Sequence, residues 1–292
     1  MNQQKILQAG KIASEVKKWI KPHIKKGVPL LEIAEKIESK IFELGGEPAF
    51  PVNLSVNEIA AHFTPSHDDK TTAYGLLKID FGVHVSGWTS DTAFSLDLEN
   101  SEENKKLIKA SEEALEEAIK TAKEKIPLNE IGKAIQKKIE LYGFSPVINL
   151  SGHSMERYNL HAGITIPNND NSKTTSLPPG LYAIEPFATT GEGKVHDGKP
   201  SGIYQLVSER NIRNLSAREI LKFIQEEYQT LPFCSRWIVK KFGTKSLIAL
   251  KQLEDNENIH QFPQLVENSQ AKVSQAEDTI FLDRKNKIIT TA

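Results

Sequence analysis

The fold of this chain is decided by the stretch GLLKIDFGVHVSGWTSDT, residues 75–92. Two apolar runs rich in β-forming residues flank Ser86-Gly87, and this pattern predicts a β-hairpin. Each run carries one carboxylate, Asp80 or Asp91, where a strand would otherwise hold Val or Ile. A buried, unpaired carboxylate costs several kcal/mol, so both acids should share a cation or a network of donors. The alternative, an Asp that caps a turn or faces water, fits Asp80 poorly because Asp80 lies deep inside its run.

The composition is that of an ordinary globular protein. With 292 residues, of which 38% are hydrophobic and 26% charged, the chain can form one large core or a core plus a subdomain. A formal net charge of −1 gives no electrostatic signature of nucleic-acid binding, and no run reaches the roughly 18 apolar residues of a membrane span. The single cysteine, Cys234, cannot form an internal disulfide, and the N-terminal residues lack the blocks of a signal peptide. We therefore expect a cytoplasmic protein without nucleic-acid or membrane partners, in which Cys234 is a small buried hydrophobic residue.

The chain contains a duplication. Amphipathic helices are predicted over residues 5–20 and 29–44, and the second of them ends at a pair of glycines. The same plan returns at a constant offset of 98 from Ile126-Pro127-Leu128 onward, after another predicted helix over residues 101–122. Past the glycines, the tripeptide Asn-Leu-Ser at 53–55 matches the one at 149–151. Two similar halves, each of two helices followed by strands, predict a pseudo-two-fold fold with the functional site at the interface.

The duplication supplies partners for the two acids of the hairpin. Residues 75–80 resemble residues 180–185 at an offset of 105, which pairs Asp80 with Glu185. More loosely, residues 90–92 resemble residues 276–278, which pairs Asp91 with Glu277. The paired acids are 11 residues apart in the first half and 92 in the second, so an insertion separates Glu185 from Glu277.

This insertion is predicted to span approximately residues 192–268 and to be helical. One helix should run from about residue 217 to 228, with Ser216 as N-cap and Glu219 completing a capping box, and a second from about 246 to 253. The basic segment RWIVKK, residues 236–241, has some likeness to a nucleic-acid-binding helix. We interpret it instead as a solvated face with a buried Trp237.

Four carboxylates at symmetry-related positions would repel one another in a shared site unless divalent cations were bound between them. His153, beside Gly152 at the end of a predicted strand, adds an imidazole to the set. Carboxylates with an imidazole suit Mn, Fe, Co or Zn better than Mg or Ca. Two such ions about 3.5 to 4 Å apart serve hydrolysis, because they lower the pKa of a bridging water and stabilise the oxyanion. We expect Asp91 and Glu277 to bridge the two ions.

Two further histidines occupy comparable places in the two halves. His62 and His161 follow the two Asn-Leu-Ser tripeptides at broadly similar spacings, and together they could donate to a substrate carbonyl and to a leaving amide nitrogen. Taken alone, each is more often a core or surface residue. His196 is compatible with either a site or a surface position, whereas His84 is interpreted as structural.

Five segments in order resemble the motif set of the type II methionine aminopeptidases: NEIAAHFTP (57–65), KIDFGVH (78–84) with DTA (91–93), GHSMERYNLHAG (152–163), AIEPFA (183–188) and EDTI (277–280). The resemblance covers essentially the whole chain, includes the helical insertion, and is to the archaeal form. It implies the α+β pita-bread (creatinase/aminopeptidase) fold, with two pseudo-symmetric halves of antiparallel sheet covered by helices. The insertion is then a subdomain within a single catalytic domain of residues 1–292.

The activity that the resemblance implies is a metal-dependent aminopeptidase, a hydrolase that removes the initiator Met from nascent proteins when the second residue is small. Its water or hydroxide would bridge two divalent ions (Co, Mn, Fe or Zn) held by Asp80, Asp91, His153, Glu185 and Glu277. By the same resemblance His62 and His161 contact the substrate, Glu185 shuttles the proton of the water, and Phe50, Leu160 and His196 line or border the pocket for the Met side chain. One departure concerns the last motif, where the family commonly has His and this chain has Asp278, with Ala276 on the other side of Glu277.

Two alternatives belong to the same fold. One is a prolidase or Xaa-Pro aminopeptidase, although such relatives usually carry a substantial N-terminal domain. The other is a non-catalytic pita-bread protein that binds the ribosome or RNA, although such a protein should have lost some of the five ligands. For the leading hypothesis we expect a monomer whose partners are N-terminal Met peptides and nascent polypeptides, with proximity to the ribosome left open.

Overall fold

The computed structural model describes residues 1–284 and 286–292. Seven α-helices lie in the described residues: α1 Gln3–Ile20, α2 Leu30–Glu43, α3 Glu102–Thr121, α4 Leu128–Leu141, α5 Leu215–Glu227, α6 Ser235–Phe242 and α7 Ser246–Asp255. The strands are β1 Glu47–Pro48, β2 Asn53–Val56, β3 Ile59–Ala61, β4 Leu76–Val85, β5 Trp88–Asp97, β6 Ser145–Pro146, β7 Ser151–Met155, β8 Thr165–Pro167, β9 Gly180–Ile184, β10 Phe187–Thr189, β11 Val195–Leu206, β12 Phe233–Cys234, β13 Ile259–Glu267, β14 Val273–Gln275, β15 Asp278–Leu282 and β16 Lys287–Ile289. None of the helices combines the length and the apolar character that crossing a bilayer would require, over the residues described.

The predicted hairpin is confirmed as β4 and β5, which pair antiparallel from Leu76↔Asp97 to Val85↔Trp88. Ser86 and Gly87 form the two-residue turn between them, with φ values of 51° and 81°. Positive φ at both turn residues matches the right-handed twist of the strands, which is why a small residue followed by Gly stands here.

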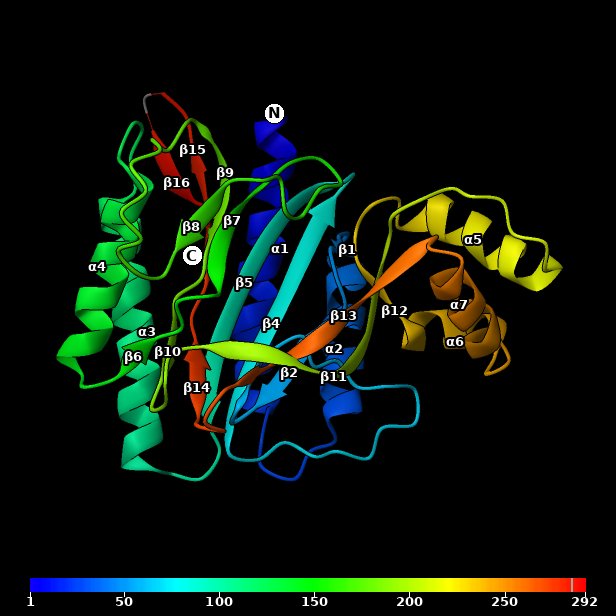
Figure 1. Cartoon of the computed structure of the whole chain (residues 1–292), viewed down its shortest axis with the longest axis horizontal. Helices are drawn as coiled ribbons and strands as arrows, with labels where there is room; N and C mark the ends of the chain where they lie inside the picture. Colours follow the sequence, from blue (N-terminus) through cyan, green and yellow to red (C-terminus); the bar gives the residue numbers. More distant parts are fainter. Residues whose placement is uncertain (285) are drawn as a thin grey trace.

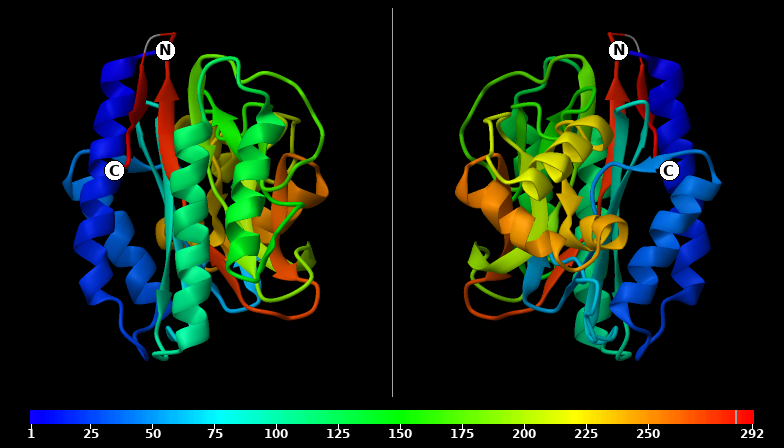
Figure 2. Two further views of the ribbon diagram at one scale, coloured as in Figure 1. Left: turned by 90° about the vertical axis from the view of Figure 1, so that its left-hand side faces the viewer. Right: turned by 90° about the vertical axis from the view of Figure 1, so that its right-hand side faces the viewer.

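The helices of the two halves predicted from the duplication form layers on the two sides of the strands. Apolar faces of α1 and α2 pack on β2 and β4 in one hydrophobic cluster, and those of α3 and α4 pack on β9 and β15 in another. Figure 2 shows the first pair of helices on one side of the hairpin and the second pair on the other. The antiparallel sheets, covered by helices, form the predicted α+β pita-bread architecture (Figure 1).

The duplication holds in detail, and the structure corrects one part of it. Helices α2 and α4 have equal lengths and start 98 residues apart. Each begins directly after a proline that forms an isolated β-bridge, Pro29 with Thr72 and Pro127 with Ser176. The match of the two Asn-Leu-Ser tripeptides, however, was out of register by two residues. Ser55 pairs with Lys78, and His153 pairs with Ala183, so the offset of 98 continues and makes Ser55 the counterpart of His153.

The segment predicted as an insertion holds β11, α5, β12, α6, α7 and β13. Its helices share a hydrophobic cluster of their own, built around Ile220, Ile224, Phe233, Ile238 and Leu253. Strand β13 leaves this cluster and pairs with β3, and thereby joins the segment to the first half (Figure 1).

Two details of the helices were predicted wrongly. The N-cap of α5 is Asn214, whose side chain accepts a hydrogen bond from the backbone N–H of Ala217, and Ser216 lies inside the helix. The segment 236–241 belongs to helix α6, which was not predicted; its deeply buried polar residue is Arg236, whereas Trp237 is only partly buried. Cys234 is a buried free thiol, as predicted.

We expect Asn214→Ala to weaken α5 by about 1 kcal/mol, because the N-cap side chain satisfies a backbone N–H at the start of the helix. Ser216→Ala, the matched control, should leave the helix unchanged or slightly more stable. Hydrogen exchange of the α5 amides checks this. If exchange became faster in the Ser216 variant and stayed unchanged in the Asn214 variant, Ser216 would be the N-cap after all.

Candidate metal centre

The predicted ligands come from five different strands or strand ends. Asp80 lies in β4 and Asp91 in β5, and the register of the hairpin sets Asp91 opposite Gly82. Glu185 directly follows β9, and Glu277 directly precedes β15, the antiparallel partner of β9. The two pairs meet because Ala93 and Glu277 form a backbone bridge between the halves, with N–H to O distances of 3.0 and 3.3 Å. The structure therefore brings both carboxylate pairs to one place.

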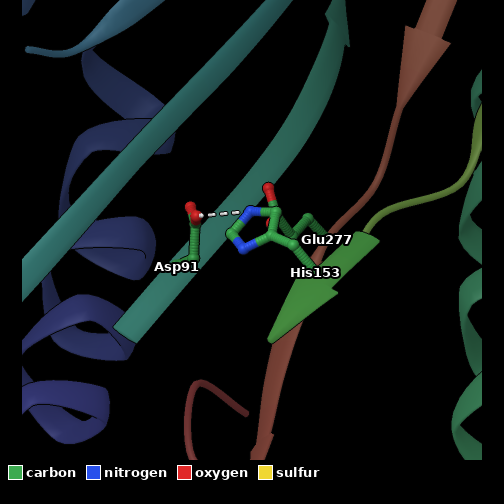
Figure 3. A group of neighbouring side chains, drawn as sticks. All are labelled: Asp91, His153 and Glu277. Atoms are coloured by element: carbon green, nitrogen blue, oxygen red, sulfur yellow. Dashed lines mark ion pairs between the residues drawn. The ribbon is translucent and has the colours of Figure 1, made fainter. Parts of the chain in front are cut away.

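His153 lies in the middle of β7, next to Gly152. A Cβ at Gly152 would lie 2.4 Å from the carbonyl oxygen of Ala183 on β9, so only glycine allows the two strands to approach this closely. The Nε2 atom of His153 is 3.7 Å from Asp91 Oδ2 and 3.7 Å from Glu185 Oε1. One ligand atom each of Asp91, His153 and Glu277 lie within 4.8 Å of one another (Figure 3).

The electrostatics of this cluster are unfavourable for the protein alone. Burial raises the pKa of Asp80 to about 6. Burial first, and then the charges of the neighbouring acids, raise the pKa of Asp91, Glu185 and Glu277 well above the usual range. Burial lowers the pKa of His153 to about 3, which keeps the imidazole neutral and able to bind a metal.

The donor set fits divalent cations. One oxygen each of Asp80, Asp91 and Glu277 is buried without a hydrogen-bond partner among the described residues. Buried oxygens of this kind need an explanation in a native structure, and a bound cation is the one that also relieves the mutual repulsion of four carboxylates. Carboxylates with a neutral imidazole are the ligands of first-row ions rather than of Mg²⁺ or Ca²⁺.

A second layer of contacts fixes the backbone of the ligands. The Thr279 hydroxyl accepts from the Asp91 N–H (2.7 Å) and donates to the Asp91 carbonyl (2.8 Å). Reciprocally, the Thr92 hydroxyl donates to the Glu277 carbonyl at 2.9 Å. Thr279, two residues after Glu277, thus holds the backbone of Asp91, and Thr92, next to Asp91, holds the backbone of Glu277.

Asp278, the departure in the last motif, has partners of its own. It forms an ion pair with Lys17 of α1 at 3.2 Å and accepts a hydrogen bond from the Thr291 hydroxyl at 2.8 Å. Lys17 also donates to Thr92 Oγ1 at 2.9 Å. The acid at position 278, next to Glu277, is therefore neutralised by a lysine of α1.

The ligands open into a cavity of about 300 Å³. Its walls include the predicted residues Phe50, Leu160, His62 and His161. His196 is not among them; it lies exposed on β11 with Nδ1 3.1 Å from Asn268 Oδ1, so the structure does not bring it to the pocket as predicted.

His62 has a defined tautomer. Its Nδ1 lies 3.2 Å from the carbonyl oxygen of Pro263 and must therefore donate to it. Burial lowers the pKa of His62 to about 4, so the ring is neutral and Nε2 offers a lone pair. Because Nδ1 already donates to Pro263, the nitrogen of His62 that is left for a substrate is Nε2, which in the neutral ring is an acceptor; that His62 contacts the substrate stays a prediction.

Several residues of the site were missed in the sequence. Gln275 is fully buried, and its Nε2 lies 3.2 Å from Asp80 Oδ2 and 3.4 Å from Glu277 Oε2. Its position two residues before Glu277 was a usable signal, since alternate residues of a strand share a face. No local signal marked Ile203, Pro232 and Phe262, which the insertion contributes to the cavity wall.

The fold and the site together define a metallopeptidase. The sequence model of metallopeptidase family M24 matches residues 4–217, and the chain belongs to this family. Over their whole lengths, this chain and the methionine aminopeptidase of Pyrococcus abyssi are 46% identical. This confirms the resemblance to methionine aminopeptidases seen in the sequence.

Solved structures show the same fold. A methionine aminopeptidase from Thermotoga maritima superposes with a TM-score of 0.70 at 21% identity, covering 99% of this chain and 95% of that one. A thermophilic Arx1 superposes with a TM-score of 0.84 at 14% identity, covering 98% and 90%. At these low sequence identities, the two superpositions show that the pita-bread fold is shared and nothing more.

We expect the thermal stabilisation given by Mn²⁺ to grow with pH. In the metal-free fold, burial raises the pKa of these carboxyls above the value of about 4 that they have in the unfolded chain, so the cost of ionising them is absent below about pH 4 and grows as the pH rises above it. For Asp80, with a pKa of about 6, the cost is complete above about pH 6. His153, with a pKa of about 3, is neutral throughout this range and adds nothing to the pH dependence. The Tm of chelator-treated protein with and without Mn²⁺ checks this, and a Tm gain that is equal at about pH 4.5 and 7.5 would contradict the assignment.

Proposed function

We propose that this chain is a methionine aminopeptidase that removes the initiator Met from new polypeptides whose second residue is small. The observation that carries the proposal is a centre of three buried carboxylates, one partly buried carboxylate and a neutral imidazole, opening into a cavity with apolar walls. The full-length identity to a methionine aminopeptidase supports the substrate class.

Two divalent ions are proposed to occupy the centre, held by Asp80, Asp91, His153, Glu185 and Glu277, with Asp91 and Glu277 shared between them. Mn, Fe, Co and Zn all suit this ligand set. Such ions supply a water of lowered pKa and a positive charge for the developing oxyanion.

The side chains around the centre have separate tasks. Phe50 and Leu160, with Phe262 from the insertion, offer an apolar wall on which the Met side chain can be buried, at about 0.8 kcal/mol for each CH₂ removed from water. His62 Nε2 accepts from a substrate N–H, and His161, at the exposed side of the cavity, is available to donate to the substrate carbonyl. Glu185, whose carboxyl has a raised pKa, is proposed to take up and return a proton.

The two alternatives are less well supported. A prolidase would need a different specificity in a chain that matches a methionine aminopeptidase from end to end. A purely binding protein would gain nothing from three buried carboxylates that each keep one oxygen unpaired among the described residues. Because the proposed substrates are newly made chains, we place the protein in the cytoplasm, as a monomer that reaches nascent chains near the ribosome.

The activity is tested with a Met-Ala peptide and, in comparison, an Ala-Pro peptide. We expect release of Met from the first alone, loss of activity on chelation and recovery with Mn²⁺ or Co²⁺, with close to two ions bound per chain by elemental analysis. Asp91→Asn should lose bound metal and all turnover. Absence of Met release with every divalent ion tried would refute the proposal.

The role of His62 is tested by His62→Ala, with His196→Ala as the matched control. Loss of a positioned hydrogen-bonding imidazole should lower kcat by about 10²- to 10⁴-fold, with metal content unchanged. His196 lies outside the cavity, so its replacement should leave kcat and KM as they are. An equal effect of the two substitutions would contradict the geometry described above.

A further inference from the structure

His62 depends on the insertion for its position. It directly follows β3 and has φ = 64°, a left-handed backbone conformation that non-glycine residues adopt only when their surroundings require it. Its Nδ1 donates to the carbonyl of Pro263 on β13, and the Phe262 ring packs edge-on against it at 5.7 Å between ring centres. Both contacts come from the segment 192–268.

The chain that leaves His62 is held by Arg236 of helix α6. The Nε of Arg236 donates to the carbonyl of Pro65 at 3.1 Å, and Nη2 lies 3.5 Å from the Thr64 hydroxyl. Arg236 is 3% exposed, so these contacts are buried between the insertion and the first half.

The guanidinium is itself fixed by Glu38 of helix α2. Its two terminal nitrogens donate to the two carboxylate oxygens at 2.6 and 2.8 Å, and the indole N–H of Trp237 donates to the same carboxylate at 3.0 Å. A planar guanidinium can bind a carboxylate with its two terminal nitrogens and still donate from Nε to a backbone carbonyl. The ammonium group of a lysine cannot make both contacts in this geometry. The pair therefore connects α2, α6 and the segment 62–65 in one geometry.

We infer that Arg236 is a positioning residue for His62, so that the insertion, besides contributing to the cavity wall, orients the imidazole whose Nε2 faces the substrate. The inference rests on the proposed function for its catalytic consequence, and on the contacts above for its structural one. Neither Arg236 nor Glu38 is among the residues that line the cavity.

The kinetic test is a double-mutant cycle on the Mn²⁺-loaded full chain with a Met-Ala peptide. Arg236→Lys should lower kcat by about 10- to 100-fold, because a small displacement of a reacting group is this costly, with metal content unchanged. In a His62→Ala background the same substitution should have almost no further effect. Equal factors in the two backgrounds, or no loss of kcat in the first, would overturn the inference. Arg210→Lys, on the exposed Arg210–Glu257 pair of the insertion, is the control and should leave kcat unchanged.

A second variant guards against misfolding. Arg236→Met combined with Glu38→Met removes both charges and leaves no unpaired buried charge, a replacement that buried ion pairs often tolerate. The ¹⁵N spectrum of the His62 ring in metal-free protein then reports the tautomer directly. We expect one tautomer with Nδ1–H in the unmodified chain and a mixture of tautomers in the double variant. An unchanged ring spectrum would overturn the inference, and because this measurement needs neither metal nor turnover, it remains decisive even if Met release is never observed.

Discussion

The structure depends on the mutual repulsion of Asp80, Asp91, Glu185 and Glu277 in one buried space. Each of these carboxyls has a raised pKa, caused first by burial, and three of the four also feel the charge of their neighbours. No fold would retain this arrangement for stability alone, since well-packed apolar residues would be at least as favourable. The arrangement makes sense when divalent cations occupy the space, and the rest of the molecule can be understood as the means of holding the acids there.

The holding is done across the junction of the two halves. Thr92 binds the backbone beside Glu277, Thr279 binds the backbone of Asp91, and the fully buried Lys78 donates to carbonyls of Asn57 and Val273, one from each half. Because these contacts are backbone-directed, one oxygen each of Asp80, Asp91 and Glu277 stays without a hydrogen-bond partner among the described residues, while Gln275 donates to the other oxygen of Asp80 and of Glu277. The helices outside the sheets stabilise each half, and the threonines and Lys78 stabilise the half-to-half geometry.

The sequence was sufficient wherever a signal was local or repeated. The hairpin follows from two β-forming runs around Ser86-Gly87, the offset of 98 located the second half, and the offset of 105 and a looser match located its acids Glu185 and Glu277. Errors arose where two local choices were nearly equal, as at Asn214 and Ser216, which are both good N-cap residues two positions apart. The eight residues of α6 were too few for a periodic pattern. The partner of Arg236 lies 198 residues away in the chain, and no spacing rule connects such positions. His196 was assigned to the pocket by the family resemblance alone, since its own flanking residues were compatible with a surface position, where the structure puts it.

The corrected register explains how a symmetric fold produces an asymmetric site. Ser55 and His153 are counterparts, each paired across its sheet to the same relative position of the neighbouring strand. In the second half this position supplies the imidazole ligand. In the first half the Ser55 hydroxyl instead accepts a hydrogen bond from the N–H of Phe63 at 3.4 Å, immediately after His62. A second imidazole at Ser55 would add another nitrogen ligand and would leave the Phe63 N–H without its partner. One position therefore supplies the proposed imidazole ligand in one half and, in the other half, a hydrogen-bond partner for the residue that follows His62.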